Sequence, residues 1–165
     1  MRLDLVGKSG AVAVLAMVLC LAGPARARGQ WAFQAGSAAS LPAQTLVQPQ
    51  ALNRMLHAKS ADKPLIFQVG SNLMFREAHI PGAQYAGPGS QDAGLNLLRQ
   101  NVARLKRSTA IVIYCGCCPW NRCPNIAPAY KMLQGMGFTN VKALYLAENF
   151  GTDWVNKGYP IARGQ

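Results

Sequence analysis

Short apolar runs and stretches of helical periodicity alternate along most of this chain. The stretches 50–59 and 92–106 carry Leu and Met residues three or four positions apart, which predicts two amphipathic helices. A third helix is predicted to begin after Asn125, a suitable N-cap, and to end at Gly135 or Gly137. The apolar runs that predict strands are 65–69, 83–85, 110–114 and 139–146.

The order of these elements predicts an α/β fold. Alternating strands and helices favour a central, mainly parallel sheet with helices packed on both of its faces. The run 110–114, Ala-Ile-Val-Ile-Tyr, has no charged residue and is typical of a central strand buried on both faces. In such sheets functional sites form at the carboxyl ends of the strands, so we expect a site in the loop that follows this run.

The first 27 residues have the pattern of a secretory signal peptide. Basic residues precede an apolar run at 11–22, and Ala25-Arg26-Ala27 matches an A-x-A cleavage site. A membrane anchor is the alternative, but the run is short for a span and a Gly-Pro pair follows it directly. We therefore expect residues 1–27 to be removed, the protein to be exported to a bacterial periplasm, and the rest of the chain to have no membrane span.

The rest of the chain is expected to consist of a leader and one domain. Residues 28–43 are rich in Ala, Gly, Ser and Gln and show no periodicity, which predicts a flexible leader. Residues 44–165 contain all of the predicted strands and helices and form a domain of ordinary size.

The chain is strongly basic, with a net charge of +11. The signal peptide holds three basic residues and one acidic residue, so the mature chain keeps a net charge of +9. The basic residues are scattered, apart from a cluster at Arg104, Lys106 and Arg107. Scattered charge and export together argue against a nucleic-acid partner, and they fit small anionic substrates.

Four cysteines follow the most apolar predicted strand within nine residues: Cys115, Cys117, Cys118 and Cys123. An exported chain meets an oxidising compartment, where structural disulfides usually close long chain segments. These thiols all lie in one loop, so they indicate local chemistry and not a disulfide framework. Cys115 is the best candidate for a nucleophile, because backbone N–H groups and the N-terminus of the next helix would lower the pKa of its thiol.

Four segments of the sequence together indicate a protein family. They are LIFQVG at 65–70, FREAHIPGAQY at 75–85, IVIYC at 111–115, and the closing segment at 136–161. In this order and at this spacing they resemble a single rhodanese domain that spans about residues 44–161. The resemblance implies an α/β fold and a sulfurtransferase. In that activity Cys115 takes a sulfane sulfur from a small anionic donor such as thiosulfate, holds it as a persulfide and passes it to a thiol acceptor.

The resemblance also implies roles within the cysteine-rich loop. Gly116 and Trp120 would line the substrate site, and loop N–H groups would hold the anionic persulfide. Arg122, the one cation of the loop, would bind an anionic donor, although it lies seven positions after the cysteine where the family has five. Gln68 and Gly70 stand where the first strand of the family ends in Asp and a basic residue. This interpretation requires no cofactor and no metal.

Two other kinds of site stay open. In a thiol–disulfide redox protein, Cys115 would form a disulfide with Cys117 or Cys118, and Cys123 would resolve it. Adjacent Cys117 and Cys118 pair poorly with each other, so Cys115–Cys118 and Cys118–Cys123 are the useful pairs, which a redox partner would reduce. In a metal-binding module, the thiolates would hold copper(I) or zinc; the spacing fits zinc poorly, whereas copper(I) needs only two or three thiolates. The accessory residues Cys117, Cys118 and Cys123 would thus control the oxidation state of Cys115 or share its sulfur.

Overall fold

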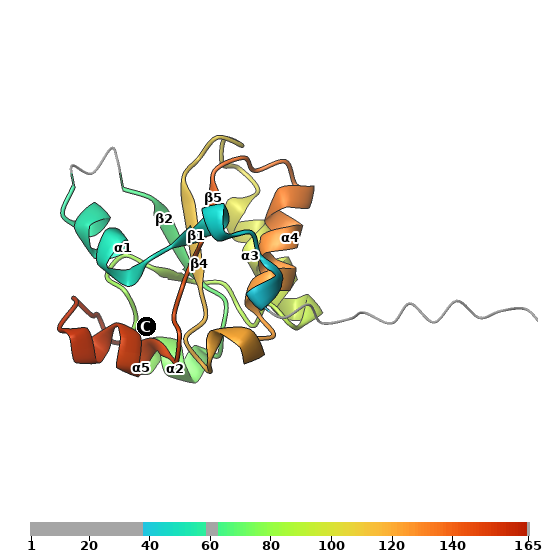
Figure 1. Ribbon diagram of the computed structural model, residues 1–165. Coiled ribbons are helices and arrows are strands. Elements are labelled where there is room, and N and C mark those ends of the chain that lie inside the picture. Colours follow the sequence, from blue (N-terminus) through green and yellow to red (C-terminus); the bar gives the residue numbers. More distant parts are fainter. Residues whose placement is uncertain (1–37, 59–62, 165) are drawn as a thin grey trace, which may run out of the picture. The chain divides into compact units, whose positions relative to one another are not determined.

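Five parallel strands form the centre of the fold (Figure 1). The computed structural model describes residues 38–58 and 63–164. The strand order is β1-β5-β4-β2-β3, and all paired neighbours run parallel. The strands are β1 (Leu46–Val47), β2 (Leu65–Gln68), β3 (Gln84–Tyr85), β4 (Ile111–Tyr114) and β5 (Val141–Leu144). The predicted α/β class with a parallel central sheet is confirmed.

In the described part of the chain, five α-helices and four 3₁₀ turns accompany the strands. The helices are α1 (Pro49–Leu56), α2 (Asn72–Glu77), α3 (Asp92–Val102), α4 (Ile126–Gly135) and α5 (Phe150–Asp153). The 3₁₀ turns are η1 (Ala38–Ser40), η2 (Ala43–Thr45), η4 (Trp120–Arg122) and η5 (Val155–Lys157).

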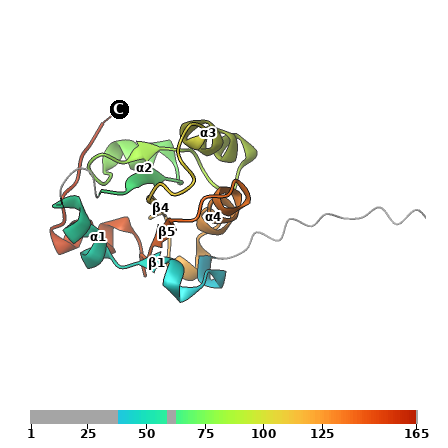
Figure 2. The ribbon, with the colours of Figure 1, turned by 90° about the horizontal axis from the view of Figure 1, so that it is seen from above.

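The side chains of the strands pack alternately into two hydrophobic cores, one on each face of the sheet. On one face, Ile111 and Ile113 of β4 pack with residues of α3 and α4. On the other face, Val112 and Tyr114 pack with residues of α1, α2 and α5. Figure 2 shows α3 and α4 on one side of the strands and α1 on the other. All four residues of β4 are buried, as expected of the central strand.

Several elements differ from the sequence prediction, and the first helix, predicted to reach residue 59, ends at Leu56. The helix predicted to reach residue 106 ends at Val102, because the next turn tightens and the N–H of Leu105 bonds the carbonyl of Val102, three residues back. Leu105 still packs against the core, which explains why its spacing looked helical. The edge strand β1 was not predicted, because a strand of two residues is too short to show a period.

The predicted leader, residues 28–43, needs a correction at its C-terminal end. Residues 1–37 lie outside the described part of the chain, and the predicted signal peptide and residues 28–37 of the predicted leader are among them. Ala38, however, is fully buried in the α3 and α4 core, and Leu41 packs against that core. Small apolar side chains thus order the end of a segment whose composition indicated flexibility.

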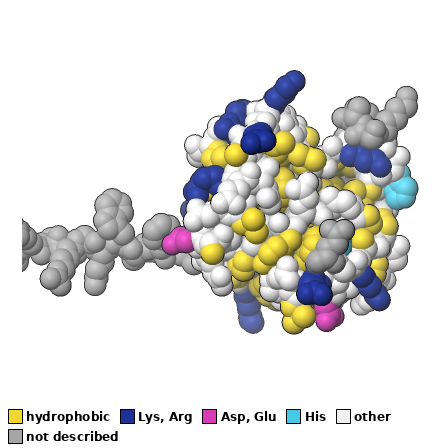
Figure 3. Space-filling model, turned by 180° about the vertical axis from the view of Figure 1, so that it is seen from behind, with side chains coloured by type: hydrophobic (Ala, Val, Ile, Leu, Met, Phe, Trp, Pro, Cys, Tyr) yellow, Lys and Arg dark blue, Asp and Glu magenta, His cyan; other side chains and the backbone are white. Residues whose placement is uncertain are grey.

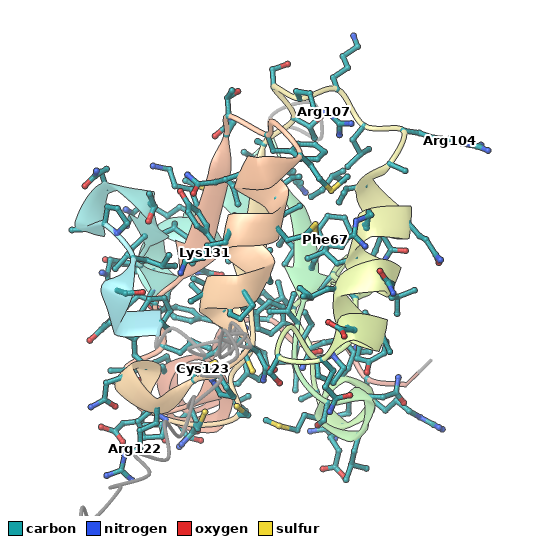
Figure 4. All side chains as sticks on the ribbon, turned by 90° about the vertical axis from the view of Figure 1, so that its right-hand side faces the viewer. Phe67, Arg104, Arg107, Arg122, Cys123 and Lys131 are labelled. Atoms are coloured by element: carbon teal, nitrogen blue, oxygen red, sulfur yellow. The ribbon has the colours of Figure 1, made fainter. Side chains whose placement is uncertain are left out.

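The basic side chains are spread over the surface. Figure 3 shows Lys and Arg at several separate places on the face it displays. Arg104 and Arg107, of the one sequence cluster, lie at the opposite end of the domain from Cys123 (Figure 4). Nowhere in the described residues is there a helix with the length and apolar character needed to cross a membrane.

Candidate active site

The cysteine-rich loop lies at the carboxyl edge of the sheet, directly after the central strand. Cys115 follows the last residue of β4 and is only 3% exposed. Gln68, the last residue of the neighbouring strand β2, pairs in register with Tyr114. The site therefore forms where two buried parallel strands end side by side, which is the position expected for this class of sheet.

Gly116 turns the chain directly after the buried cysteine. Its φ of 78° lies in the left-handed region, which glycine adopts without strain. A Cβ atom at this position would stand 2.6 Å from Cβ of Phe150, and the Gly116 carbonyl accepts a hydrogen bond from the Phe150 N–H. The turn leaves Cys115 buried and brings Cys117 to the surface. Gly116 therefore shapes the loop through its backbone.

All four thiols are free and lie close together. The Sγ of Cys115 is 3.3 Å from that of Cys117, which is 2.8 Å from that of Cys118. The Sγ atoms of Cys115, Cys117 and Cys123 all lie within 4.8 Å of one another. Of the two partners predicted for Cys115, Cys117 and Cys118, the structure puts Cys117 against it. The sharp turn at Gly116 brings this i, i+2 pair into contact.

Asn125 connects the loop to a neighbouring segment. We expected its side chain to cap α4, but it makes no capping hydrogen bond. Instead its amide Nδ2 donates to Sγ of Cys115 at 3.2 Å, and its Oδ1 accepts from the N–H of Ser90 at 3.0 Å. The side chain is 7% exposed, so both bonds form away from bulk water. Asn125 is thus a thiol-positioning residue whose role the sequence pattern did not reveal.

Gln68 orders the adjacent strand end without a charge. Its side chain is 2% exposed, and its Oε1 accepts from the N–H of Gly70 at 3.1 Å. Its Nε2 donates to the backbone carbonyl of Cys115 at 3.5 Å, a long hydrogen bond. A neutral amide therefore links the ends of β2 and β4. In the rhodanese family, which the sequence resembles, a carboxylate stands at this position.

The thiols do not ionise equally. Hydrogen bonds from Cys115 and Cys117, and then the N–H groups of Asn125 and Ile126, lower the pKa of Cys123 well below its ordinary value despite burial. The hydrogen bond from Cys117 lowers the pKa of Cys115. A hydrogen bond to Cys123, burial and the nearby Cys123 charge outweigh it, so the pKa of Cys115 is raised overall. The N–H groups at the start of α4, which we had expected to act on Cys115, hydrogen-bond Cys123 and add to the lowering of its pKa.

Trp120 and Arg122 lie on the short turn η4. Trp120 is half-buried, and its ring packs against Tyr145 with a centroid distance of 5.3 Å. It also borders a small space beside Cys115 and Cys118. Arg122 is exposed, and Figure 4 shows its side chain directed away from Cys123. The structure thus brings Trp120 to the thiols and leaves Arg122 outside them.

A cavity of about 420 Å³ opens on the other side of Cys115. Most of its lining is apolar, with contributions from Leu73, Tyr114 and Phe150. Glu77 is the one charged residue among the described residues that line it. The cavity can admit a small molecule to Cys115, and neither Lys nor Arg stands among these lining residues.

Two residues of the matched segments have structural roles. His79 stacks on Phe75, and its Nδ1 lies 2.8 Å from the Phe75 carbonyl. Trp154 is fully buried, and its Nε1 donates to the carbonyl of Pro160 at 2.9 Å. Both side chains fix turns that surround the site, and neither lines the cavity.

Comparisons with solved structures agree with this architecture. The Alr3790 protein from Anabaena sp. is 21% identical, with 72% of this chain and 92% of that chain covered and a TM-score of 0.53. Thiosulfate sulfurtransferase from Pseudomonas aeruginosa is 21% identical, with 74% and 21% covered and a TM-score of 0.54. A persulfide form of an EanB variant with ergothioneine is 22% identical, with 72% and 28% covered and a TM-score of 0.54. At these identities the likeness shows the fold alone.

Sequence comparisons identify the family. A search of curated proteins found no match. The model of the rhodanese-like domain family matches residues 48–146, which is more than half of the chain and runs from the start of α1 to just beyond β5. The matched segment includes the whole cysteine-rich loop. This chain therefore belongs to the rhodanese-like domain family.

Proposed function

We propose that this protein is an exported sulfurtransferase that carries a sulfane sulfur as a persulfide on Cys115. The observation that carries the proposal is the position of Cys115, which ends the central strand of a rhodanese-like domain and borders a cavity of about 420 Å³. The fold is shared with a thiosulfate sulfurtransferase and with part of an EanB variant whose structure holds a cysteine persulfide. The signal-peptide pattern of residues 1–27 supports export to the periplasm.

The proposed reaction has two steps. The Cys115 thiol loses its proton to solvent, and its sulfur attacks the sulfane sulfur of thiosulfate. An S–S bond then forms while the S–S bond of the donor breaks and sulfite leaves with the electron pair. In the second step a thiolate acceptor attacks the outer sulfur, and Cys115 leaves as a thiolate. The Asn125 amide and the N–H of Cys117, which both hydrogen-bond Cys115 Sγ, can stabilise the anionic sulfur in each step.

The surroundings of Cys115 bear on the choice of partners. From the sequence we expected Arg122 to bind a small anionic donor. In the structure Arg122 is exposed, and Glu77 is the one charged residue in the described lining of the cavity. We therefore assign stabilisation of a leaving anion to backbone and amide N–H groups, and we keep a small sulfur donor and a thiol acceptor as the partners. Apolar lining also favours acceptors with an apolar body.

Intact mass measurement tests this function directly. The purified, reduced protein is incubated with thiosulfate and weighed before and after treatment. We expect a gain of one sulfur atom that a thiol reductant removes and that is lost in Cys115→Ser. Cys118→Ser is the matched control in the same loop and should keep the gain. A sulfur adduct of equal amount in Cys115→Ser would contradict the proposal.

A second candidate is a thiol–disulfide redox protein, with a thiol-redox partner that reduces the loop. The contact of 3.3 Å between the Sγ atoms of Cys115 and Cys117 favours it. Oxidation would join these two sulfurs and pass two protons and two electrons to the disulfide of a substrate protein, and the dithiol of the redox partner would then reduce the loop again. Loss of two hydrogens without any gain of sulfur, in protein purified without reductant, would favour this function over sulfur transfer.

A further inference from the structure

Three thiols of the loop face one another closely enough to share an ion. The Sγ atoms of Cys115, Cys117 and Cys123 lie within 4.8 Å of one another. Cys115 follows strand β4, Cys117 follows the turn at Gly116, and Cys123 follows the 3₁₀ turn η4. We propose that these three side chains bind one copper(I) ion as a three-thiolate site. The proposal does not depend on sulfur transfer, which needs Cys115 alone.

The distances suit a trigonal site. Metal–thiolate bonds of about 2.3 Å arranged in a plane around one ion separate the sulfur atoms by about 4 Å. The sulfur atoms of Cys115 and Cys117 are 3.3 Å apart, and none of the three pairs exceeds 4.8 Å. The Cys115–Cys117 pair therefore needs to open by less than about one ångström when an ion replaces the thiol protons, and no pair needs to close by more than that. The loop holds the ligands near their bound positions before any ion arrives.

Amide groups around the thiols support the charge that such a site would carry. Three thiolates and one copper(I) ion have a net charge of −2, which burial alone would penalise. Nδ2 of Asn125 and the N–H of Cys117 hydrogen-bond Cys115, and the N–H groups of Asn125 and Ile126 hydrogen-bond Cys123. Hydrogen bonds of this kind orient metal ligands and stabilise their charge.

The donor set selects copper(I) over harder ions. Among the residues that the structure describes, the trio is the one cluster of three His, Cys, Asp or Glu side chains close enough to hold an ion. Zinc prefers four ligands in structural sites, and within the described residues no His or carboxylate joins the trio. Cys118 contacts Cys117, but it does not belong to the set of ligand atoms that all lie within 4.8 Å of one another. Soft thiolates with a coordination number of three match copper(I). Cys117 is exposed, so an ion can enter from the surface.

Anaerobic titration tests the proposal. The reduced protein receives copper(I) in competition with a chromogenic copper(I) chelator, and stoichiometry and affinity are read from the chelator. We expect one ion per chain and a loss of affinity of more than about 100-fold in Cys117→Ser, because removing a ligand exceeds the loss from removing an outer hydrogen bond. Cys118→Ser, one position along and outside the trio, should change the affinity by less than about threefold.

Alkylation gives a second measurement that does not depend on a variant. In the copper-loaded protein, Cys118 should still react with a maleimide, and Cys117 should be protected. Equal loss of affinity in Cys117→Ser and Cys118→Ser, or protection of Cys118, would place the ion on the surface pair and overturn the proposal. A chelator that strips the ion at equal concentration would also overturn it. None of these results changes the sulfur adduct that we expect on Cys115 in metal-free protein. The copper proposal and the sulfur-transfer proposal can therefore be contradicted independently of each other.

Discussion

The four thiols of the loop form two pairs with different surroundings. Cys115 and Cys123 are each 3% exposed and receive hydrogen bonds from amide groups of Asn125 and the residues beside it. Cys117 is exposed, Cys118 is half-buried, and their sulfur atoms contact each other at 2.8 Å. Residue type is the same in both pairs. The position of each thiol relative to the strand end and the helix N-terminus decides which pair is ordered and which is accessible.

The largest effect should come from the turn that separates the two pairs. Gly116→Ala forces a side chain into a positive φ and to within 2.6 Å of Phe150 Cβ, so we expect it to lower the free energy of unfolding by about 3 kcal/mol. Urea or thermal unfolding measures the loss. Gly135→Ala is the matched control, because a Cβ there meets no atom within 4 Å, and we expect it to be neutral or stabilising. Equal stability of the two variants would show that the turn does not constrain the loop.

The second largest effect should be a difference between the two pairs in how fast their thiols react with a reagent from solvent. With a bulky maleimide and the reduced native protein, Cys117 and Cys118 should be modified about 100-fold faster than Cys115 and Cys123, because the buried pair reacts only after local opening. Peptide mass spectrometry at short times identifies the modified residues, and a denatured sample supplies the intrinsic rates. Similar rates for all four residues in the native state would remove the distinction between the pairs.

The amide that orders the buried pair should have a smaller effect. Asn125→Ala removes the donor to Cys115 Sγ and leaves the N–H of Ser90 without its acceptor, which should cost about 2 kcal/mol of stability. It should also slow the loading of sulfur on Cys115, because the anionic sulfur loses a donor. Asn96→Ala, at an exposed position of α3, should change stability by less than about 0.5 kcal/mol. Sulfur loading at the wild-type rate in Asn125→Ala would argue against a positioning role.

The smallest effect concerns pH. Since the pKa of Cys123 is lowered in the fold, its thiolate stabilises the folded state above the unfolded pKa, near 9.0, and this contribution is lost as the pH falls toward the folded pKa. We expect ultraviolet thiolate absorbance from one cysteine at neutral pH in reduced, metal-free protein, and its loss in Cys123→Ser. Absorbance that persists in Cys123→Ser and disappears in Cys115→Ser would assign the charge to Cys115 instead.

The strands were predictable because their signal is local. The wholly apolar run that became β4 is buried on both faces, and a strand with two buried faces must be apolar at every position. The short edge strand β1 was missed because two residues carry no period, and its pairing with β5 is a tertiary contact. The end of α3 was placed too late, because Leu105 keeps a buried side chain after the helical backbone has ended.

The candidate site was predictable in position and only partly in detail. A cysteine at the end of the most buried strand pointed to the carboxyl edge of the sheet, where the structure has it. The role of Asn125 was hidden, because an Asn before a helix normally caps it, and only packing brings this side chain to Cys115 and Ser90. The exposure of Arg122 was equally hidden, since η4 sets its direction.

By itself, the sequence determined the α/β class, the family, the buried strands and the loop in which the chemistry should occur. These follow from the periodicity and type of neighbouring residues, which a linear chain displays directly. Only the tertiary structure decided which thiol contacts which, which thiols are buried, and which residues face the cavity. Those properties depend on a turn of positive φ at Gly116 and on the side chain of Asn125, which hydrogen-bonds both Cys115 and the distant Ser90, and the sequence pattern does not display them.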